Sequence, residues 1–187
     1  MSSTPTTTAT AVSLPTGTWT IDPTHTRIGF VARHMMVTKV RGSFGEFSAE
    51  VEVAENPFES KLSAEVQMAS IDTGNADRDG HLRTNDFFDI EQHPTMRLVA
   101  TGFEGSGDSY VMHADLTIKG VTKPVDFELE FDGVGQDPWG GTRAGFAATT
   151  TINRKDWGIE WNAPLETGGV LVGEKVQIDL DVQLVKS

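Results

Sequence analysis

The sequence has no cysteine, so disulfide bonds, thiolate nucleophiles, iron–sulfur clusters and cysteine-ligated zinc sites are all excluded. It also has few basic residues: 15 Lys and Arg stand against 27 Asp and Glu, a formal net charge of −12. An acidic surface repels polyanions, so nucleic acid and anionic membrane surfaces are poor candidate partners. No run approaches the roughly 18 consecutive apolar residues of a membrane-spanning helix, so stable membrane insertion is not expected.

The N-terminal region lacks both parts of a secretory signal. The first basic side chain is Arg27, and the only apolar cluster before it lies within residues 9–14. Residues 1–16 are rich in Ser, Thr and Pro and have little apolar surface whose burial would offset the entropy lost on ordering. We therefore expect a disordered tail over residues 1–16, a single domain over residues 17–187, and a cytoplasmic location.

Apolar residues recur at every second position in six segments, which is the pattern of a strand with one buried face. The six segments begin at Phe47, Leu62, Tyr110, Val125, Ala144 and Val176. Weaker strands are predicted at residues 18–21, 27–33, 40–44 and 97–103. The total of about eight to ten strands, with turn residues between them, indicates an antiparallel all-β protein.

The length of the predicted strands favours a barrel. Several approach ten residues, or about 30 Å of extended chain, and about eight such strands close naturally into a barrel that is either filled or holds one small ligand. Residues 75–90 lack alternation and offer Asn75 or Asp77 as an N-cap, so one or two short helices are expected there. A β-sandwich interaction module with a solid core is an alternative.

Small residues among the apolar positions leave two interpretations of the interior open. The alanines in question are Ala49, Ala64, Ala100, Ala114, Ala144 and Ala148. They either face bulky partners in a packed core, or they leave an apolar tunnel for a long ligand, each methylene of which contributes about 0.8 kcal/mol. Similarly, Phe87, Phe88, Trp157 and Trp161 either plug one end of the barrel or line a mouth together with Met35–Met36.

Catalytic and metal-binding motifs are weak. The histidines show no close ligand spacing; a hairpin that brings His25 and His34 together is an alternative. The acid-rich segment 75–86 departs from a calcium loop at both ends and contains Arg83. Nucleophile elbows and phosphate loops are absent. We expect no catalytic residue, metal or cofactor; the alternative is a metal-dependent or acid/base enzyme using His25, His34 and the acidic helix.

Five separated motifs resemble the YceI-like family in sequence and order. They are WTIDPTHTRIGF (19–30), VRGSFGEF (40–47), DRDGHLRTNDFFD (77–89), LTIKGVTKPV (116–125) and NRKDWG (153–158). The resemblance implies an extended, lipocalin-like antiparallel β-barrel that binds a polyisoprenoid or similar amphiphile in an elongated pore, without catalytic residues. The sequence departs from many relatives in lacking a secretory signal, and in having Asp-Trp-Gly at 156–158 where Asp-Phe-Gly is usual.

The predicted ligand is therefore a polyisoprenoid, an isoprenoid quinone or a similar lipid, bound for transport or storage. The residues predicted to line its site are Phe30, Phe47, Val51, Val66, Met68, Phe87, Leu116, Phe127, Phe146 and Ile178. The candidates for binding a polar head group at the mouth are Arg33, His34, Arg78 and His81. Because a register error of one residue reverses every face, the strands near Arg27 and Arg97 are the least determined. A homodimer is compatible with such a barrel, but the sequence gives no direct sign of one.

Overall fold

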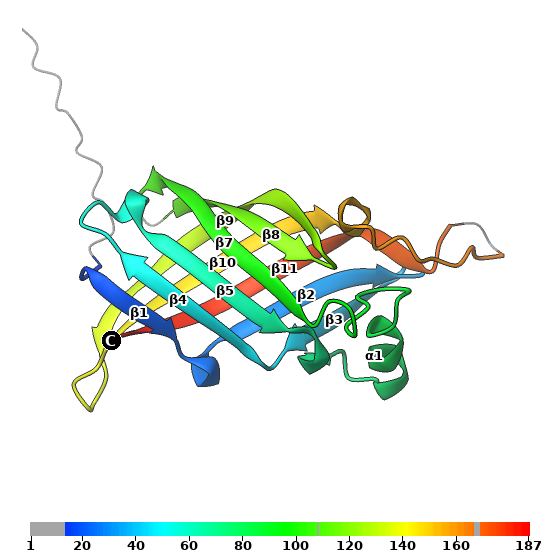
Figure 1. Ribbon diagram of the computed structural model, residues 1–187, viewed down its shortest axis with the longest axis horizontal. Helices are drawn as coiled ribbons and strands as arrows, with labels where there is room; N and C mark the ends of the chain where they lie inside the picture. Colours follow the sequence, from blue (N-terminus) through cyan, green and yellow to red (C-terminus); the bar gives the residue numbers. More distant parts are fainter. Residues whose placement is uncertain (1–13, 108, 167–168) are drawn as a thin grey trace, which may run out of the picture.

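The computed structural model describes residues 14–107, 109–166 and 169–187 (Figure 1). Its strands are β1 (Gly17–Ile21), β2 (Arg27–His34), β3 (Thr38–Phe44), β4 (Phe47–Val53), β5 (Lys61–Gln67), β6 (Ile71–Asp72), β7 (Thr95–Ser106), β8 (Ser109–Ile118), β9 (Val121–Gln136), β10 (Thr142–Asn153) and β11 (Val172–Lys186). The helical segments are η1 (Pro23–His25), η2 (Pro57–Glu59), η3 (Met68–Ser70), α1 (Ala76–Leu82) and η4 (Arg154–Trp157). Most of the predicted tail, residues 1–13, lies outside the described residues.

Eight strands close into an antiparallel barrel in the order β1-β4-β5-β7-β8-β9-β10-β11, and β1 pairs back to β11. Strand β11 has two partners along the side away from β10: its residues 172–181 pair with β2, and residues 184–186 pair with β1. The β2–β3 hairpin therefore extends the wall beyond β1. The predicted antiparallel barrel is confirmed, and the sandwich alternative is wrong because the sheet closes on itself.

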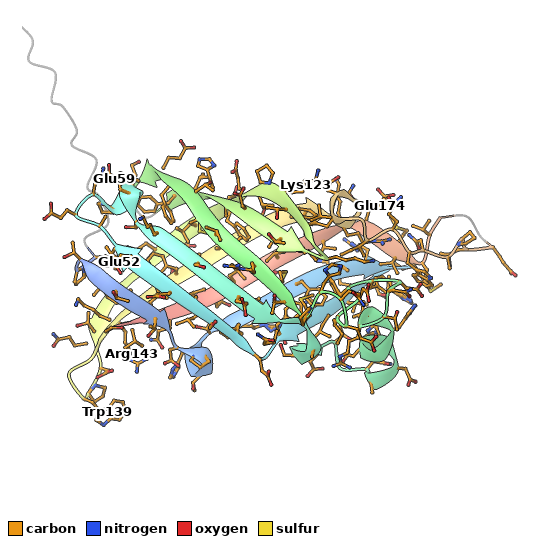
Figure 2. All side chains as sticks on the ribbon, in the orientation of Figure 1. Glu52, Glu59, Lys123, Trp139, Arg143 and Glu174 are labelled. Atoms are coloured by element: carbon orange, nitrogen blue, oxygen red, sulfur yellow. The ribbon has the colours of Figure 1, made fainter. Side chains whose placement is uncertain are left out.

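Alternation along the strands separates the interior from the surface. In β8, every second residue from Tyr110 to Ile118 is buried, and the residues between them are more exposed. Charged side chains such as Glu52, Lys123 and Glu174 point away from the barrel (Figure 2). The period of two in the sequence thus determines which side chains enter the core.

One α-helix is present in the described part of the chain, within the segment where one or two were predicted. It begins after Asn75, whose side chain accepts a hydrogen bond from the Arg78 amide at 2.9 Å. The buried carboxylate of Asp79 accepts hydrogen bonds from the backbone and hydroxyl of Thr73, which fastens the helix to the end of β6. No helix among the described residues is long and apolar enough to cross a membrane.

The NRKDWG motif, 153–158, closes the barrel near α1. Asn153 caps η4 by accepting a hydrogen bond from the Lys155 amide. The buried Arg154 guanidinium donates to the carbonyl oxygens of residues 159, 172 and 173. The Trp157 indole donates to the Leu116 carbonyl at 2.9 Å, and Gly158 has a φ of 76°. The motif is therefore structural: it ties the end of β10 to β8 and to the start of β11.

A charged network fastens the start of the barrel to the β9–β10 turn. Arg143 donates to Asp22 at 2.6 Å and to Asp137 at 2.9 Å. The Nδ1 atom of His25 lies 2.9 Å from the same Asp22 carboxylate. Hydrogen bonds from His25 and then from Arg143 lower the pKa of Asp22 from 3.8 to about 2. The Asp22 carboxylate therefore remains charged at pH values at which an unperturbed aspartate is protonated.

This lowered pKa predicts a dependence of stability on pH. The Asp22 carboxylate contributes its full stabilisation above pH 3.8, and this contribution is lost as the pH falls through about 2. In Arg143→Met we expect a smaller decrease in the free energy of unfolding between pH 3.8 and about 2. Part of the decrease should remain, because His25 still lowers the pKa of Asp22. Urea unfolding at several pH values measures the effect, and Lys123→Met is the matched control. An unchanged pH dependence in Arg143→Met would contradict the assignment.

Candidate functional site

An apolar cavity of about 190 Å³ lies inside the barrel. Each of the eight barrel strands contributes to its wall, and β2 adds Ile28. The polar residues in the lining are Ser60, Arg97 and Tyr110. The cavity therefore offers a ligand hydrophobic contact with few hydrogen-bonding groups.

The cavity is displaced from the barrel end that carries α1. Its lining includes residues of η2 but none of α1, η3 or η4. Figure 1 shows the turn between β4 and β5, which contains η2, and α1 toward opposite ends of the long axis. Phe58 and Tyr110 contribute aromatic rings with centroids 6.3 Å apart, and Leu14 also lines the cavity. We refer to these two regions as the η2 end and the α1 end.

Several inward-facing side chains remain partly accessible to solvent. Leu62, Leu98 and Leu180 line the cavity and are only half-buried, whereas Phe127 is 2% exposed. A ligand that removes such apolar surface from water gains about 25 cal/mol of binding free energy per Å². An apolar cavity of about 150 Å³ is large enough for benzene. The cavity in its present form therefore accommodates one small apolar group, and a longer chain requires it to widen or to extend through its accessible side.

Six of the ten predicted lining residues lie in the cavity wall. They are Val51, Val66, Leu116, Phe127, Phe146 and Ile178. Their contact with a ligand stays a prediction. The leucines Leu98, Leu129 and Leu180 also line the cavity and were missed, although extending the same alternation would have found them. Leu14 and Phe58 had no such signal, because they belong to a predicted tail and to a turn.

The other four predicted lining residues lie outside the cavity, in the packed region around the α1 end. The ring of Phe30 covers the backbone of Gly42, where an added Cβ would lie 2.3 Å from it. Phe47 and Met68 belong to a separate core cluster, and Phe87 packs in the cluster that contains Trp157. The described cavity therefore does not include this packed region, and an apolar tunnel along the whole barrel stays a prediction.

The residues predicted to form either a plug or a mouth at one end of the barrel fall into a buried group and an exposed group. Phe87 and Trp157 are buried, with Phe88 and Trp161 packed against their cluster, so these residues form a plug rather than a mouth. Met35 and Met36 lie at the exposed tip of the β2–β3 hairpin.

None of the four predicted head-group residues lines the cavity. Arg33 and His34 lie at the end of β2. Arg78 donates to the hydroxyl and carbonyl oxygens of Thr73, and His81 lies 2.8 Å from Asp86. A head group bound by these residues would lie outside the cavity, and such binding stays a prediction. Arg97 is the basic residue in the described lining and was not predicted, but it is exposed and lies opposite Thr117, on the outward-facing side of β7.

The proposed pairing of His25 with His34 is wrong. His25 lies in η1 before β2, and His34 is the last residue of that eight-residue strand. An extended chain of this length separates them by about 25 Å. In the acidic segment, Asp79 instead accepts hydrogen bonds from Thr73. The two histidines cannot share a metal ion or a substrate atom.

Comparisons with known proteins agree with the barrel. A UPF0312 protein of Staphylococcus epidermidis is 40% identical over 164 residues, which are 87% of this chain and 94% of the relative. Among solved structures, the YceI protein of Campylobacter jejuni has a TM-score of 0.70 and 26% identity, covering 83% of this chain and 90% of that one. A polyisoprenoid binding domain from Saccharophagus degradans has a TM-score of 0.69 and 16% identity, with coverages of 90% and 98%.

The family model described as the YceI-like domain matches residues 19–184. That range starts in β1 and ends in β11, so it includes all the strands of the closed barrel. This chain therefore belongs to the YceI-like family.

Proposed function

We propose that this protein binds a long apolar lipid chain inside its barrel, for transport or storage, and that an isoprenoid chain is the preferred ligand. The observation that carries the proposal is the apolar cavity enclosed by all eight strands. The fold shared with a polyisoprenoid binding domain supports the choice of ligand class. A lipid chain needs hydrophobic contact and few hydrogen bonds, and this lining supplies that combination.

Small residues beside the cavity explain where the ligand would gain room. Ala49 and Ala64 lie opposite each other on β4 and β5, and Ala64 also pairs with Leu98 on β7. All three line the cavity. Met96 and Met112 are further lining residues, and their unbranched thioethers repack readily around an apolar ligand. The wall near β4, β5 and β7 is therefore the part best suited to widen around a longer chain.

The same cavity supports binding rather than catalysis. In the part of the chain that the structure describes, its lining includes one basic residue, Arg97, and no aspartate, glutamate or histidine. General acid–base chemistry requires a titratable group within hydrogen-bond reach of the reacting atom. We therefore propose a carrier without covalent chemistry.

Direct capture of the ligand tests the proposal. The purified full-length chain is incubated with a polyprenol, an isoprenoid quinone and a straight-chain fatty acid of similar length, and is then examined by native mass spectrometry. We expect a one-to-one complex with the isoprenoid compounds. Organic extraction of the protein as purified provides an independent measurement of any lipid already bound. Absence of every complex, with no lipid extracted, would refute the proposal; preference for the fatty acid would refute the isoprenoid assignment.

A further inference from the structure

One continuous segment of this acidic chain carries a net positive charge. Residues 23–45 contain Arg27, Arg33, Lys39 and Arg41 but none of the 27 acidic residues. The segment forms η1 and the β2–β3 hairpin, which extends the barrel wall. The hairpin is thus a local basic surface on a protein whose net charge is −12.

The basic side chains near the hairpin tip lie on its outer face without partners. Arg33 is directly opposite Lys39, and Arg41 follows two residues later on the same face. All three are exposed, and none takes part in an ion pair found among the described residues. Like charges placed opposite each other destabilise a strand pair. An external anion bound beside this pair would offset the cost.

Acidic residues lie along the hairpin's other neighbours. On β11, Asp181 is opposite Arg27 and Asp179 is opposite Gly29, both remote from the tip. Glu174 is paired with Lys155. The loop between η4 and β11 contains Glu160 and Glu166, and on β6 Asp72 is opposite Ser43. The acidic residues of β11 that are paired with β2 therefore lie near Arg27, at the end of the hairpin away from residues 35–37.

The tip combines exposed apolar side chains with an unfavourable backbone. Met35, Met36 and Val37 are 44%, 59% and 73% exposed. Met35 and Met36 have φ values of 53° and 61°, and the Val37 amide donates to the His34 carbonyl. Two central residues with positive φ are the pattern of a type I′ turn, which strongly favours Asn-Gly. The methionines are thus poorly suited to the turn, and the backbone conformation gives no reason for their presence there.

We propose that the β2–β3 hairpin docks this protein on an anionic lipid surface. The apolar tip would enter the interface, and Arg33, Lys39 and Arg41 would contact the phosphate groups behind it. Each basic residue near such a surface strengthens binding by about fivefold, and unbranched apolar side chains add hydrophobic contact. Charge on an edge strand also prevents unwanted strand pairing. That role accounts for Lys39 and Arg41 on β3, but not for Arg33 or the methionines.

Vesicle co-sedimentation of the full chain tests the docking surface. We expect binding to vesicles of phosphatidylglycerol and phosphatidylcholine in equal parts, little binding to phosphatidylcholine alone, and release in about 1 M salt, where the screening length is about 3 Å. The double variant Met35→Asn/Met36→Gly is expected to fold at least as stably as the wild type, because its residues suit the turn. Its binding should nevertheless fall by about tenfold. Unchanged binding by this variant would overturn the role of the tip.

A charge variant and a control at another site complete the test. Arg33→Glu/Lys39→Glu should reduce binding at least tenfold, since two attractive charges become repulsive. Trp139 is 87% exposed on the β9–β10 turn, near the η2 end (Figure 2). Trp139→Ser should leave vesicle binding unchanged, and loss of binding in this variant would assign docking to that turn instead. Ligand capture from detergent solution is measured in parallel, because docking and cavity binding can then fail independently.

Discussion

Replacing Ala64 by Phe is expected to reduce lipid uptake at least tenfold while the barrel stays folded. Ala64 lines the cavity, is only half-buried, and pairs with Ala49 and Leu98. A phenyl group has about the size of benzene, which occupies an apolar cavity of about 150 Å³, so the new ring would take up most of the 190 Å³ available. Uptake of a fluorescent polyprenyl analogue, together with urea unfolding, measures both effects.

Two further alanines test the location of the cavity. Ala148 also lines it, so Ala148→Phe should lower uptake too, but Ala148 is 3% exposed in a core cluster, so a loss of stability of about 1–3 kcal/mol is expected as well. Ala114 is 1% exposed and packed in a core cluster outside the lining. Ala114→Phe should therefore destabilise the protein by about 1–3 kcal/mol through overpacking and should reduce uptake less while the protein remains folded. Wild-type uptake by Ala64→Phe would show that the lipid does not occupy this cavity.

Arg154→Met is expected to destabilise the barrel by about 3 kcal/mol, because burial of a polar group without its hydrogen-bond partner costs about 1–3 kcal/mol. The guanidinium donates to the carbonyl oxygens of Gly173 and Ile159 at 2.9 and 2.8 Å. Both carbonyls lose this donor in the variant. Burial lowers the pKa of Arg154, although a guanidinium remains charged at neutral pH.

The adjacent Lys155 provides the control for this substitution. Its ammonium group is 2.8 Å from Glu174, and both side chains are more than 40% exposed. Exposed ion pairs contribute about 0–1 kcal/mol, so Lys155→Met should have a small effect. Urea unfolding at neutral pH compares the two variants. If they lose similar amounts of stability, the carbonyl contacts of Arg154 do not carry the role assigned to them.

The strands were predictable because each depends on a local pattern. The alternation from Tyr110 to Ile118 becomes β8 with every second side chain buried, and that from Val176 to Leu184 lies within β11. Asn75 was one of two candidate N-caps, and it caps α1. Such signals need only neighbouring residues, since strand periodicity and helix capping act within a few positions of the chain. The motif at 153–158 also indicated the family, although the hydrogen bonds that it forms could not be predicted from its sequence.

The site was predicted less completely than the fold. Val51 and Val66 line the cavity as expected, whereas Phe30 lies over Gly42 and Met68 belongs to a packed cluster. Val51, Val66, Phe30 and Met68 are all apolar residues in or beside predicted strands. Nothing in the local pattern distinguishes those that line the cavity from those that are packed against other side chains. The pairing of β2 was also not predictable from the local pattern. Strand β11 pairs with β2 over one part of its length and with β1 over another, and this change of partner places the β2–β3 hairpin beyond β1.

The sequence alone thus determined an antiparallel barrel, its family and an apolar interior, because periodicity sets the direction of each side chain relative to its own strand. Tertiary structure alone decided where the interior is empty. Empty space depends on the summed volumes of side chains from many strands, and on where aperiodic segments such as η2 and α1 come to rest against them. No single segment contains that information, so the position of the cavity follows only from the assembled barrel.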